Sequence, residues 1–276
     1  MDLLPWSLVL LSGVIHSLWN LKVKQVDNRS LFLAVAYFCA GVFMLPLAAG
    51  FDGLQLPPGA VLPVMLSAVA ESMYVVALAQ AYSRYDLSFV YPIARGSGPI
   101  WATAAGALFF REQLSALGVL GMAVIICGML IISFRKEEGS LRALGLSLLI
   151  GFFIGSYSSL DRLAIEYTSV YNLLFWKFII AGIILLALHV RQQSLWENIR
   201  ASIKLSALAG LFIISAYFLV VLAMKHSNLG YVTVGRESGI AFTCLLSALL
   251  LKERIGRVKL LGILVLFLGI VMLRLA

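Results

Sequence analysis

Long apolar stretches fill almost the whole chain, and short polar, Gly- or Pro-containing breaks separate them. A helix needs about 20 mostly apolar residues to cross a bilayer. The stretches do not alternate with period two, as strands of a membrane barrel would, and an open sheet leaves backbone groups unpaired in lipid. The pattern therefore predicts ten transmembrane helices, at residues 3–21, 31–50, 61–83, 87–110, 115–134, 142–161, 171–190, 204–224, 229–251 and 257–275.

The connections between these stretches are short. The longest, residues 191–203, carries Leu195, Trp196, Ile199 and Ile203 at near-helical spacing, which predicts a short interfacial helix. No connection is long enough to form a soluble domain, so any chemistry must lie within the bundle.

An internal repeat appears when the sequence is shifted by 141 positions, which places residues 85–132 over residues 226–273. Ten positions then match. Leu and Val matches are expected by chance in an apolar chain, but matching charged residues and glycines indicate a duplication. These informative pairs are Arg95/Arg236, Gly98/Gly239, Glu112/Glu253, Gly121/Gly262 and Gly128/Gly269.

The repeat unit contains five predicted helices, and an odd number makes the second copy enter the membrane in the opposite sense. We therefore predict an all-α integral membrane protein of ten transmembrane helices in two inverted five-helix repeats, residues 1–137 and 138–276. Two such halves have two near-equivalent arrangements, each opening the centre to one side. This organisation favours a transporter over a receptor or an enzyme.

The composition agrees with lipid as the solvent: 62% of the 276 residues are hydrophobic and only 12% are charged, against about 25% charged in soluble domains. An ordinary soluble protein, a disordered chain and a disulfide scaffold are therefore excluded. The basic residues are scattered, so the net charge of +8 does not indicate nucleic-acid binding. Cys39, Cys127 and Cys244 lie in apolar segments without metal-ligand spacing, so no metal is predicted.

The basic residues predict an orientation. Of the 21 Lys and Arg residues, three lie deep within the membrane (Arg95, Lys177 and Arg236), and fourteen lie in or beside the loops that follow odd-numbered helices. Because cytoplasmic loops are enriched in Lys and Arg, this count places both termini outside the cytoplasm. The four on the other side are Arg111, Arg162, Lys225 and Arg274.

Ionisable side chains within the membrane are costly and are candidates for function. Arg95 lies in the Pro- and Gly-rich segment 91–99, which predicts a kinked, cavity-lining helix. Arg236 is its counterpart, and two guanidinium groups facing one cavity would bind a carboxylate, phosphate or phosphonate. Alternatively, Arg95 pairs with Glu71, because the predicted depths of these two residues in the membrane differ by only about 6 Å. Arg236 would then be neutralised by Glu237, although adjacent residues on a helix point about 100° apart.

The remaining candidates each have two readings. Lys177 either faces the cavity or extends to the interface, and Asp161, near the predicted end of its helix, is equally compatible with an interfacial cap. Aromatic side chains are candidates for stacking on a ligand or for packing; they are Tyr74, Tyr91, Trp101, Tyr157 and Tyr217. The matched glycines are predicted to pack helices together, and Glu112 and Glu253 to fix the short turns.

No nucleophile triad, phosphate-binding loop, zinc motif or haem signature is present, so the sequence predicts neither an enzyme nor a cofactor.

Several segments make the chain resemble EamA domains of the drug/metabolite transporter superfamily. They are residues 16–20 (HSLWN), 91–95 (YPIAR), 108–112 (LFFRE), 157–162 (YSSLDR) and 249–254 (LLLKER). The family often has Gly before the turn Glu, where this chain has Arg111 and Lys252. The resemblance implies a ten-helix carrier of small metabolites, often an exporter, with a cavity lined by the first, third, fourth, sixth, eighth and ninth helices. It also implies cytoplasmic termini, against the charge count.

The leading hypothesis is a secondary transporter, an exporter or exchanger in the inner membrane, for a small anionic or zwitterionic metabolite. Arg95 and Arg236 would hold the acidic group, Glu71 would balance charge, and the chain would act as a monomer or homodimer. The alternative is a non-transporting membrane subunit or a lipid-handling protein, whose arginines would be structural or bind lipid head groups.

Overall fold

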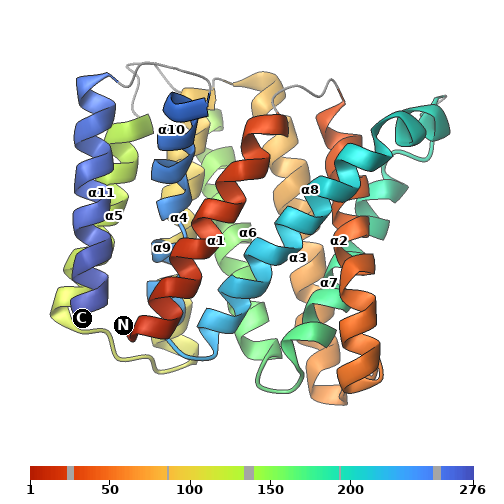
Figure 1. Ribbon diagram of the computed structural model, residues 1–276, viewed down its shortest axis with the longest axis horizontal. Coiled ribbons are helices and arrows are strands. Elements are labelled where there is room, and N and C mark those ends of the chain that lie inside the picture. Colours follow the sequence, from red (N-terminus) through yellow and green to blue (C-terminus); the bar gives the residue numbers. More distant parts are fainter. Residues whose placement is uncertain (24–27, 86, 134–139, 193, 251–255) are drawn as a thin grey trace.

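The computed structural model describes residues 1–23, 28–85, 87–133, 140–192, 194–250 and 256–276, and these residues form a bundle of helices (Figure 1). The helices are α1 (Leu3–Val23), α2 (Arg29–Asp52), α3 (Pro58–Arg84), α4 (Leu87–Phe109), α5 (Ala116–Ser133), α6 (Leu141–Ala164), α7 (Val170–Ala187), α8 (Leu195–Met224), α9 (Leu229–Gly235), α10 (Ser238–Leu250) and α11 (Arg257–Leu275).

The apolar helices match the predicted spans closely. Among the described residues, α2, α3, α6, α7, α8 and α11 each contain a stretch long and apolar enough to cross a membrane. Shorter apolar helical stretches cover Leu3–Leu18 and Ala116–Ile132. Both termini lie at the same end of the bundle, as an even number of crossings requires (Figure 1). The all-helical membrane fold is therefore confirmed.

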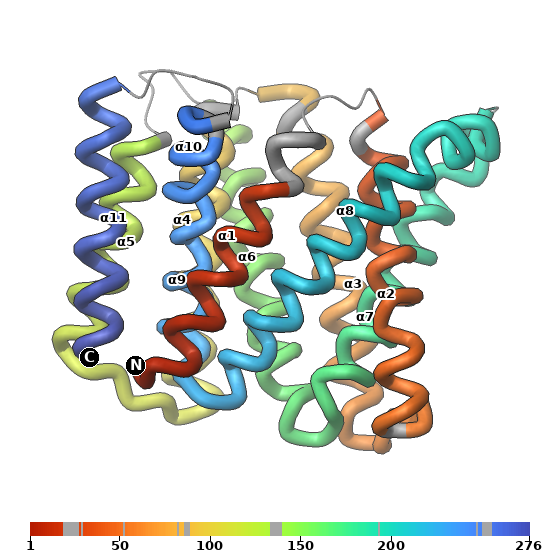
Figure 2. The backbone as a smooth tube through the Cα atoms, in the orientation of Figure 1, coloured from red at the N-terminus to blue at the C-terminus, as the bar shows by residue number. Residues whose placement is uncertain are grey.

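Two predicted boundaries are wrong. The segment predicted as a separate interfacial helix continues into the next span, so α8 is one helix of 30 residues that crosses the bundle obliquely (Figure 2). The predicted helix 229–251 is interrupted at Arg236 and Glu237, which separates α9 from α10.

The packing of the helices has the symmetry expected of two repeats. α5 packs against its counterpart α11, and α2 packs against its counterpart α7. In the first repeat α1 packs on α8 and α10 of the second; in the second repeat α6 packs on α3 and α4 of the first. Exchanging the repeats leaves this pattern unchanged, as expected for inverted repeats. The predicted boundary at residues 137 and 138 lies outside the described residues.

Glycines set the distance between the paired helices. A Cβ atom added to Gly128 would lie 2.5 Å from the nearest backbone atom of α11, and one added to Gly269 would lie 2.7 Å from the backbone of α5. The α2–α7 pair is built in the same way: an added Cβ would lie 2.7 Å from the α7 backbone at Gly41 and 2.6 Å from the α2 backbone at Gly182. The prediction that these glycines serve helix packing is confirmed for the α5–α11 pair.

The turn between α4 and α5, which belongs to the first repeat, contacts the start of α9 in the second repeat. The Glu112 carboxylate accepts hydrogen bonds from Leu229 N at 2.8 and 2.9 Å and so caps the start of α9, rather than only fixing its own turn. Partial burial raises the pKa of Glu112, and the donors of Leu229 and Gly230 oppose that rise. Arg111 has a left-handed φ of 53°, a conformation that glycine adopts without strain.

Candidate functional site

Three ionisable side chains from three helices meet in the bundle core. Lys177 Nζ of α7 lies 2.5 Å from Asp161 Oδ2 of α6 and 2.6 Å from Glu71 Oε2 of α3. Lys177 and Asp161 are completely buried, and Glu71 is 4% exposed. Lys177 therefore does not extend to the interface, and Asp161 is not an interfacial cap. We call these three residues the carboxylate–lysine cluster.

The two carboxylates accept different numbers of hydrogen bonds. Asp161 accepts a hydrogen bond from Ser67 Oγ at 2.5 Å, one from Lys177 Nζ at 2.5 Å and one from Tyr217 OH. Glu71 Oε1 accepts a hydrogen bond from Tyr37 OH at 3.0 Å. Glu71 Oε2 contacts the Lys177 ammonium without hydrogen-bond geometry and has no hydrogen-bond partner among the described residues.

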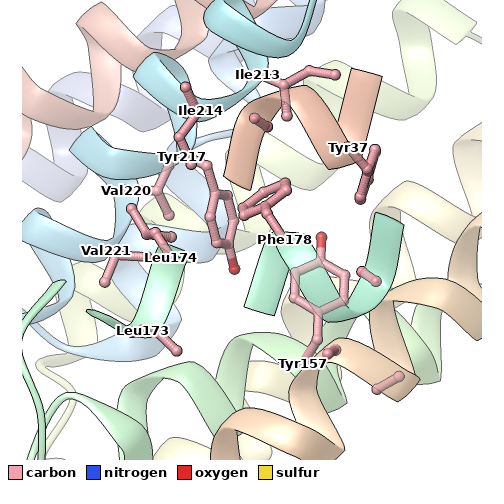
Figure 3. Close-up of a cluster of buried hydrophobic side chains, with 14 of the residues drawn as sticks. Tyr37, Tyr157, Leu173, Leu174, Phe178, Ile213, Ile214, Tyr217, Val220 and Val221 are labelled. Carbon is pink, nitrogen blue, oxygen red and sulfur yellow. The ribbon is translucent and has the colours of Figure 1, made fainter. Parts of the chain in front are cut away.

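Aromatic rings surround the lysine. Lys177 Nζ lies 4.5 Å from the ring centroid of Tyr157 and 4.3 Å from that of Tyr217. Figure 3 shows the side chains of Tyr157, Tyr217, Phe178 and Tyr37 gathered in the same region of the core. The rings exclude water and face the cation with their negative π surfaces, so they stabilise the ammonium where the dielectric is low.

A second ion pair joins the two repeats. Arg95 Nε of α4 lies 3.0 Å from Glu237 Oε2, at the junction of α9 and α10, and both side chains are buried. The alternative that Arg95 pairs with Glu71 is therefore wrong. The depths along the membrane normal are compatible, but α4 packs chiefly on α6 and α9, and its contact with α3 is slight. Glu237 consequently neutralises Arg95 rather than Arg236.

The backbone changes conformation where Arg236 and Glu237 lie. Glu237 N donates to Val234 O at 3.0 Å, Gly239 N to Arg236 O at 3.1 Å and Ile240 N to Glu237 O at 3.0 Å. These bonds span three residues rather than four, as in a 3₁₀ turn, and such turns inside helices often mark functional positions. Discontinuous membrane helices place polar side chains and backbone groups near the midplane, where carriers bind substrates.

Arg236 differs from Arg95 in its surroundings. Its Nη2 lies 3.4 Å from Tyr157 OH, and its Cζ lies 5.3 Å from the ring centroid of Tyr217. In the described part of the chain, no carboxylate lies within salt-bridge distance of Arg236, and its side chain is partly exposed. The guanidinium group therefore has capacity for a further acidic partner.

The structure places the other predicted aromatic residues in three different surroundings. The Tyr74 ring packs on that of Tyr157 with centroids 5.9 Å apart. Tyr91 packs against the hydrophobic cluster that involves α5 and α9 to α11. Trp101 is 46% exposed and stacks edge-on with Phe152, so it lies on the outer surface and is not brought to the cluster.

The sequence reasoning missed Tyr37 and Ser67 and left the role of Asp161 open. Asp161 was placed near a helix end because its helix was predicted to end at residue 161, whereas α6 ends at Ala164. Tyr37 and Ser67 carry no signal in a single sequence, because hydroxyl groups in apolar helices commonly bond to their own backbone. The side chain of Asn20, at the end of the segment HSLWN, lies outside the described residues, as does Glu253.

A surface pocket lies elsewhere. It has a volume of about 530 Å³ and is lined by Gln55, Pro57, Glu166, Tyr167, Thr168, Ser169, Asn172 and Lys225. None of the central ionisable residues lines this pocket. It is therefore not part of the candidate site.

Comparison with solved structures and with known proteins agrees with the fold. One solved crystal structure superimposes with a TM-score of 0.80, although only 13% of residues are identical, and the match covers 99% of this chain and 96% of the other. An uncharacterized transporter of Archaeoglobus fulgidus is 25% identical over 260 residues, which is 91% of this chain and 90% of that protein. The uncharacterized membrane protein YvaE of Bacillus subtilis is 29% identical over 98 residues, or 36% of this chain and 76% of that protein.

The family comparison covers both halves. The model of the EamA-like transporter family matches residues 4–134 and again residues 141–275. The two matches correspond to α1 to α5 and to α6 to α11, in agreement with the repeated packing pattern. The chain is therefore a multi-pass membrane protein that belongs to the EamA-like transporter family, which consists of transporters rather than enzymes.

Proposed function

We propose that the protein is a secondary transporter of a small anionic or zwitterionic metabolite and that Arg236 binds the acidic group of the substrate. The observation that carries the proposal is the partly exposed Arg236 at the α9–α10 junction, without a carboxylate partner among the described residues. A guanidinium group in a low-dielectric site binds carboxylate, phosphate or phosphonate oxygens by charge-assisted hydrogen bonds.

Arg95 has a different role in this proposal from the one that its repeat position suggests. Because Glu237 neutralises Arg95, the pair presents both a donor and an acceptor beside Arg236. An acidic group on the substrate would bind Arg236, and an ammonium group, if the substrate has one, would approach Glu237. Tyr157 and Tyr217, which already contact Arg236, would form the wall of the binding site.

The position of the Arg95–Glu237 pair between the repeats supports a mechanism of alternating access. α4 belongs to the first repeat, and the α9–α10 junction belongs to the second, so any rocking of one repeat against the other moves these two side chains relative to each other. We propose that the transporter works as an exporter or exchanger in the inner membrane, as a monomer or homodimer.

The test begins with a thermal-shift screen of the full-length protein in detergent against small sulfonates, phosphonates, carboxylates and amino acids, because a ligand of the folded state raises its Tm. Ligands that raise the Tm are then tested for transport in proteoliposomes. Arg236→Gln should abolish both the Tm shift and transport. Arg142→Gln, on the exposed surface of α6, is the matched control and should change neither.

Two results would refute the proposal. One is full transport by Arg236→Gln. The other is a wild-type protein that transports none of these compounds but binds lipid head groups, which would favour the lipid-handling alternative.

A further inference from the structure

The central ionisable side chains divide into two groups of opposite charge. With all groups ionised, the carboxylate–lysine cluster carries one surplus negative charge, and the arginine side carries one surplus positive charge. Together the two groups are neutral, which lowers the cost of placing so many charges in an apolar bundle. The first group is Glu71, Asp161 and Lys177, and the second is Arg95, Arg236 and Glu237.

The same two tyrosines connect these groups. Lys177 lies against the rings of Tyr157 and Tyr217, while Arg236 lies 3.4 Å from Tyr157 OH and 5.3 Å from the Tyr217 ring centroid. Tyr157 is 1% exposed and Tyr217 is 5% exposed. Water therefore screens the two groups little, and a change of charge in one group alters the free energy of the other.

An anion bound to Arg236 disturbs this balance. It neutralises the surplus positive charge and leaves the surplus negative charge of the carboxylate–lysine cluster uncompensated. Uptake of one proton by a carboxylate restores neutrality without any other change in covalent bonding. We propose that Glu71, Asp161 and Lys177 form a proton-binding site and that a substrate anion at Arg236 is carried together with one proton, an inference that rests on the proposed function.

The contacts assign the proton to Glu71. Asp161 accepts three hydrogen bonds, from Ser67, Lys177 and Tyr217, and such bonds stabilise an ionised carboxylate. Glu71 accepts one, from Tyr37, and among the described residues its Oε2 is held only by the ion pair with Lys177 at 2.6 Å. A proton on Oε2 converts Glu71 to a neutral carboxyl group, and Lys177 stays paired with Asp161. Release of the anion expels the proton again, because the two ligands bind with mutual preference.

The other titratable groups around Glu71 must be distinguished from it. The tyrosines that face the cluster are Tyr37 from α2, Tyr157 from α6 and Tyr217 from α8. An unperturbed tyrosine titrates only at about pH 10. His16 of α1 lies near the two arginines, whose positive charges disfavour its protonated form, and histidine is the side chain that ordinarily titrates near neutral pH, so its contribution must be separated from that of Glu71. A variant of His16 is consequently the matched control.

The first experiment detects the proton without any substrate. Infrared difference spectra of the full-length protein in liposomes, recorded across the pH range in which carboxyl groups titrate, report the carbonyl stretch of a protonated carboxyl group. The titrating band contains contributions from the other carboxyl groups of the chain as well, so we expect the band of Glu71→Gln to lack the contribution of one carboxyl group that the wild type and His16→Gln both show. An undiminished band in Glu71→Gln would overturn the assignment.

A second variant covers the case in which Glu71→Gln does not fold. Lys177→Gln removes the ammonium and leaves two carboxylates side by side, so we expect one more protonated carboxyl group than in the wild type at the same pH. An unchanged infrared signal in Lys177→Gln contradicts the proposal.

The second experiment measures coupling to an anion. Methanesulfonate is a suitable probe, because its charge does not change with pH. If one proton binds with it, its Kd should rise about tenfold per pH unit over the range in which the anion-free protein has lost that proton. The rise should persist in His16→Gln and vanish in Glu71→Gln. A wild-type Kd that does not depend on pH would refute coupling, whereas absence of methanesulfonate binding would count against the proposed anion site and leave the infrared result to decide the proton site.

Discussion

Replacement of Lys177 with methionine tests how strongly the central charges depend on one another. Methionine roughly keeps the length of the side chain and removes the ammonium, which is fully buried and lies 2.5 and 2.6 Å from two carboxylate oxygens. Removal of one partner from a buried ion pair costs about 3–5 kcal/mol. Loss of the cation–π contacts with two tyrosine rings adds about 1 kcal/mol. We therefore expect a loss of about 4–6 kcal/mol, a large part of the stability of a typical protein.

The free energy of unfolding can be measured by reversible denaturation in mixed detergent micelles. Lys204→Met, on an exposed position of α8, is the matched control and should change stability by less than about 0.5 kcal/mol. Adding Asp161→Asn and Glu71→Gln to Lys177→Met removes every charge of the cluster and should restore most of the loss. Lowering the pH should also restore part of it, because protons neutralise the unpaired carboxylates. Equal stability of Lys177→Met and Lys204→Met would refute this reasoning.

Four further predictions concern packing, the turn between α4 and α5, and orientation. Gly128→Ala should cost about 1–3 kcal/mol of folding free energy, because the new methyl group meets the α11 backbone, whereas Gly145→Ala, with open space around it, should stabilise α6 slightly. Glu112→Ala should cost about 1 kcal/mol through loss of the cap on Leu229. The stability of the wild type should also fall as the pH rises through the raised pKa of Glu112, and this pH dependence should be absent in Glu112→Gln. Arg111→Gly should gain about 0.5 kcal/mol by relieving the left-handed backbone. A reporter enzyme active only outside the cytoplasm, fused to the C-terminus, should be active if the charge count gives the correct orientation.

The fold could be predicted because the hydropathy pattern and the 141-residue repeat are each carried by many residues, so a few unusual positions do not hide them. The interruption between α9 and α10 could not, since apolar length alone does not distinguish a continuous span from two half-helices. Gly235 and Gly239 flank the interruption and are the signal that could have suggested it.

The ion pairs were harder to predict than the ionisable residues. Arg95 and Glu71 were compared by depth along the membrane normal, which says nothing about which helices are neighbours. The structure pairs Arg95 with Glu237, which is 142 residues away in the sequence. An error of three residues at the end of α6 was enough to leave an interfacial cap as a possible role for Asp161, which the structure places beside Lys177.

The length of α8 has a mechanical consequence. Its 30 residues extend about 45 Å, whereas the hydrocarbon core of a bilayer is about 30 Å thick. A helix that is longer than the hydrocarbon core accommodates the difference in length by tilting, and the tilt changes with the thickness of the membrane. Because Tyr217 lies seven residues before the end of α8, a change of inclination would move its ring relative to Lys177 and Arg236. We therefore expect the activity to depend on the acyl-chain length of the surrounding lipids.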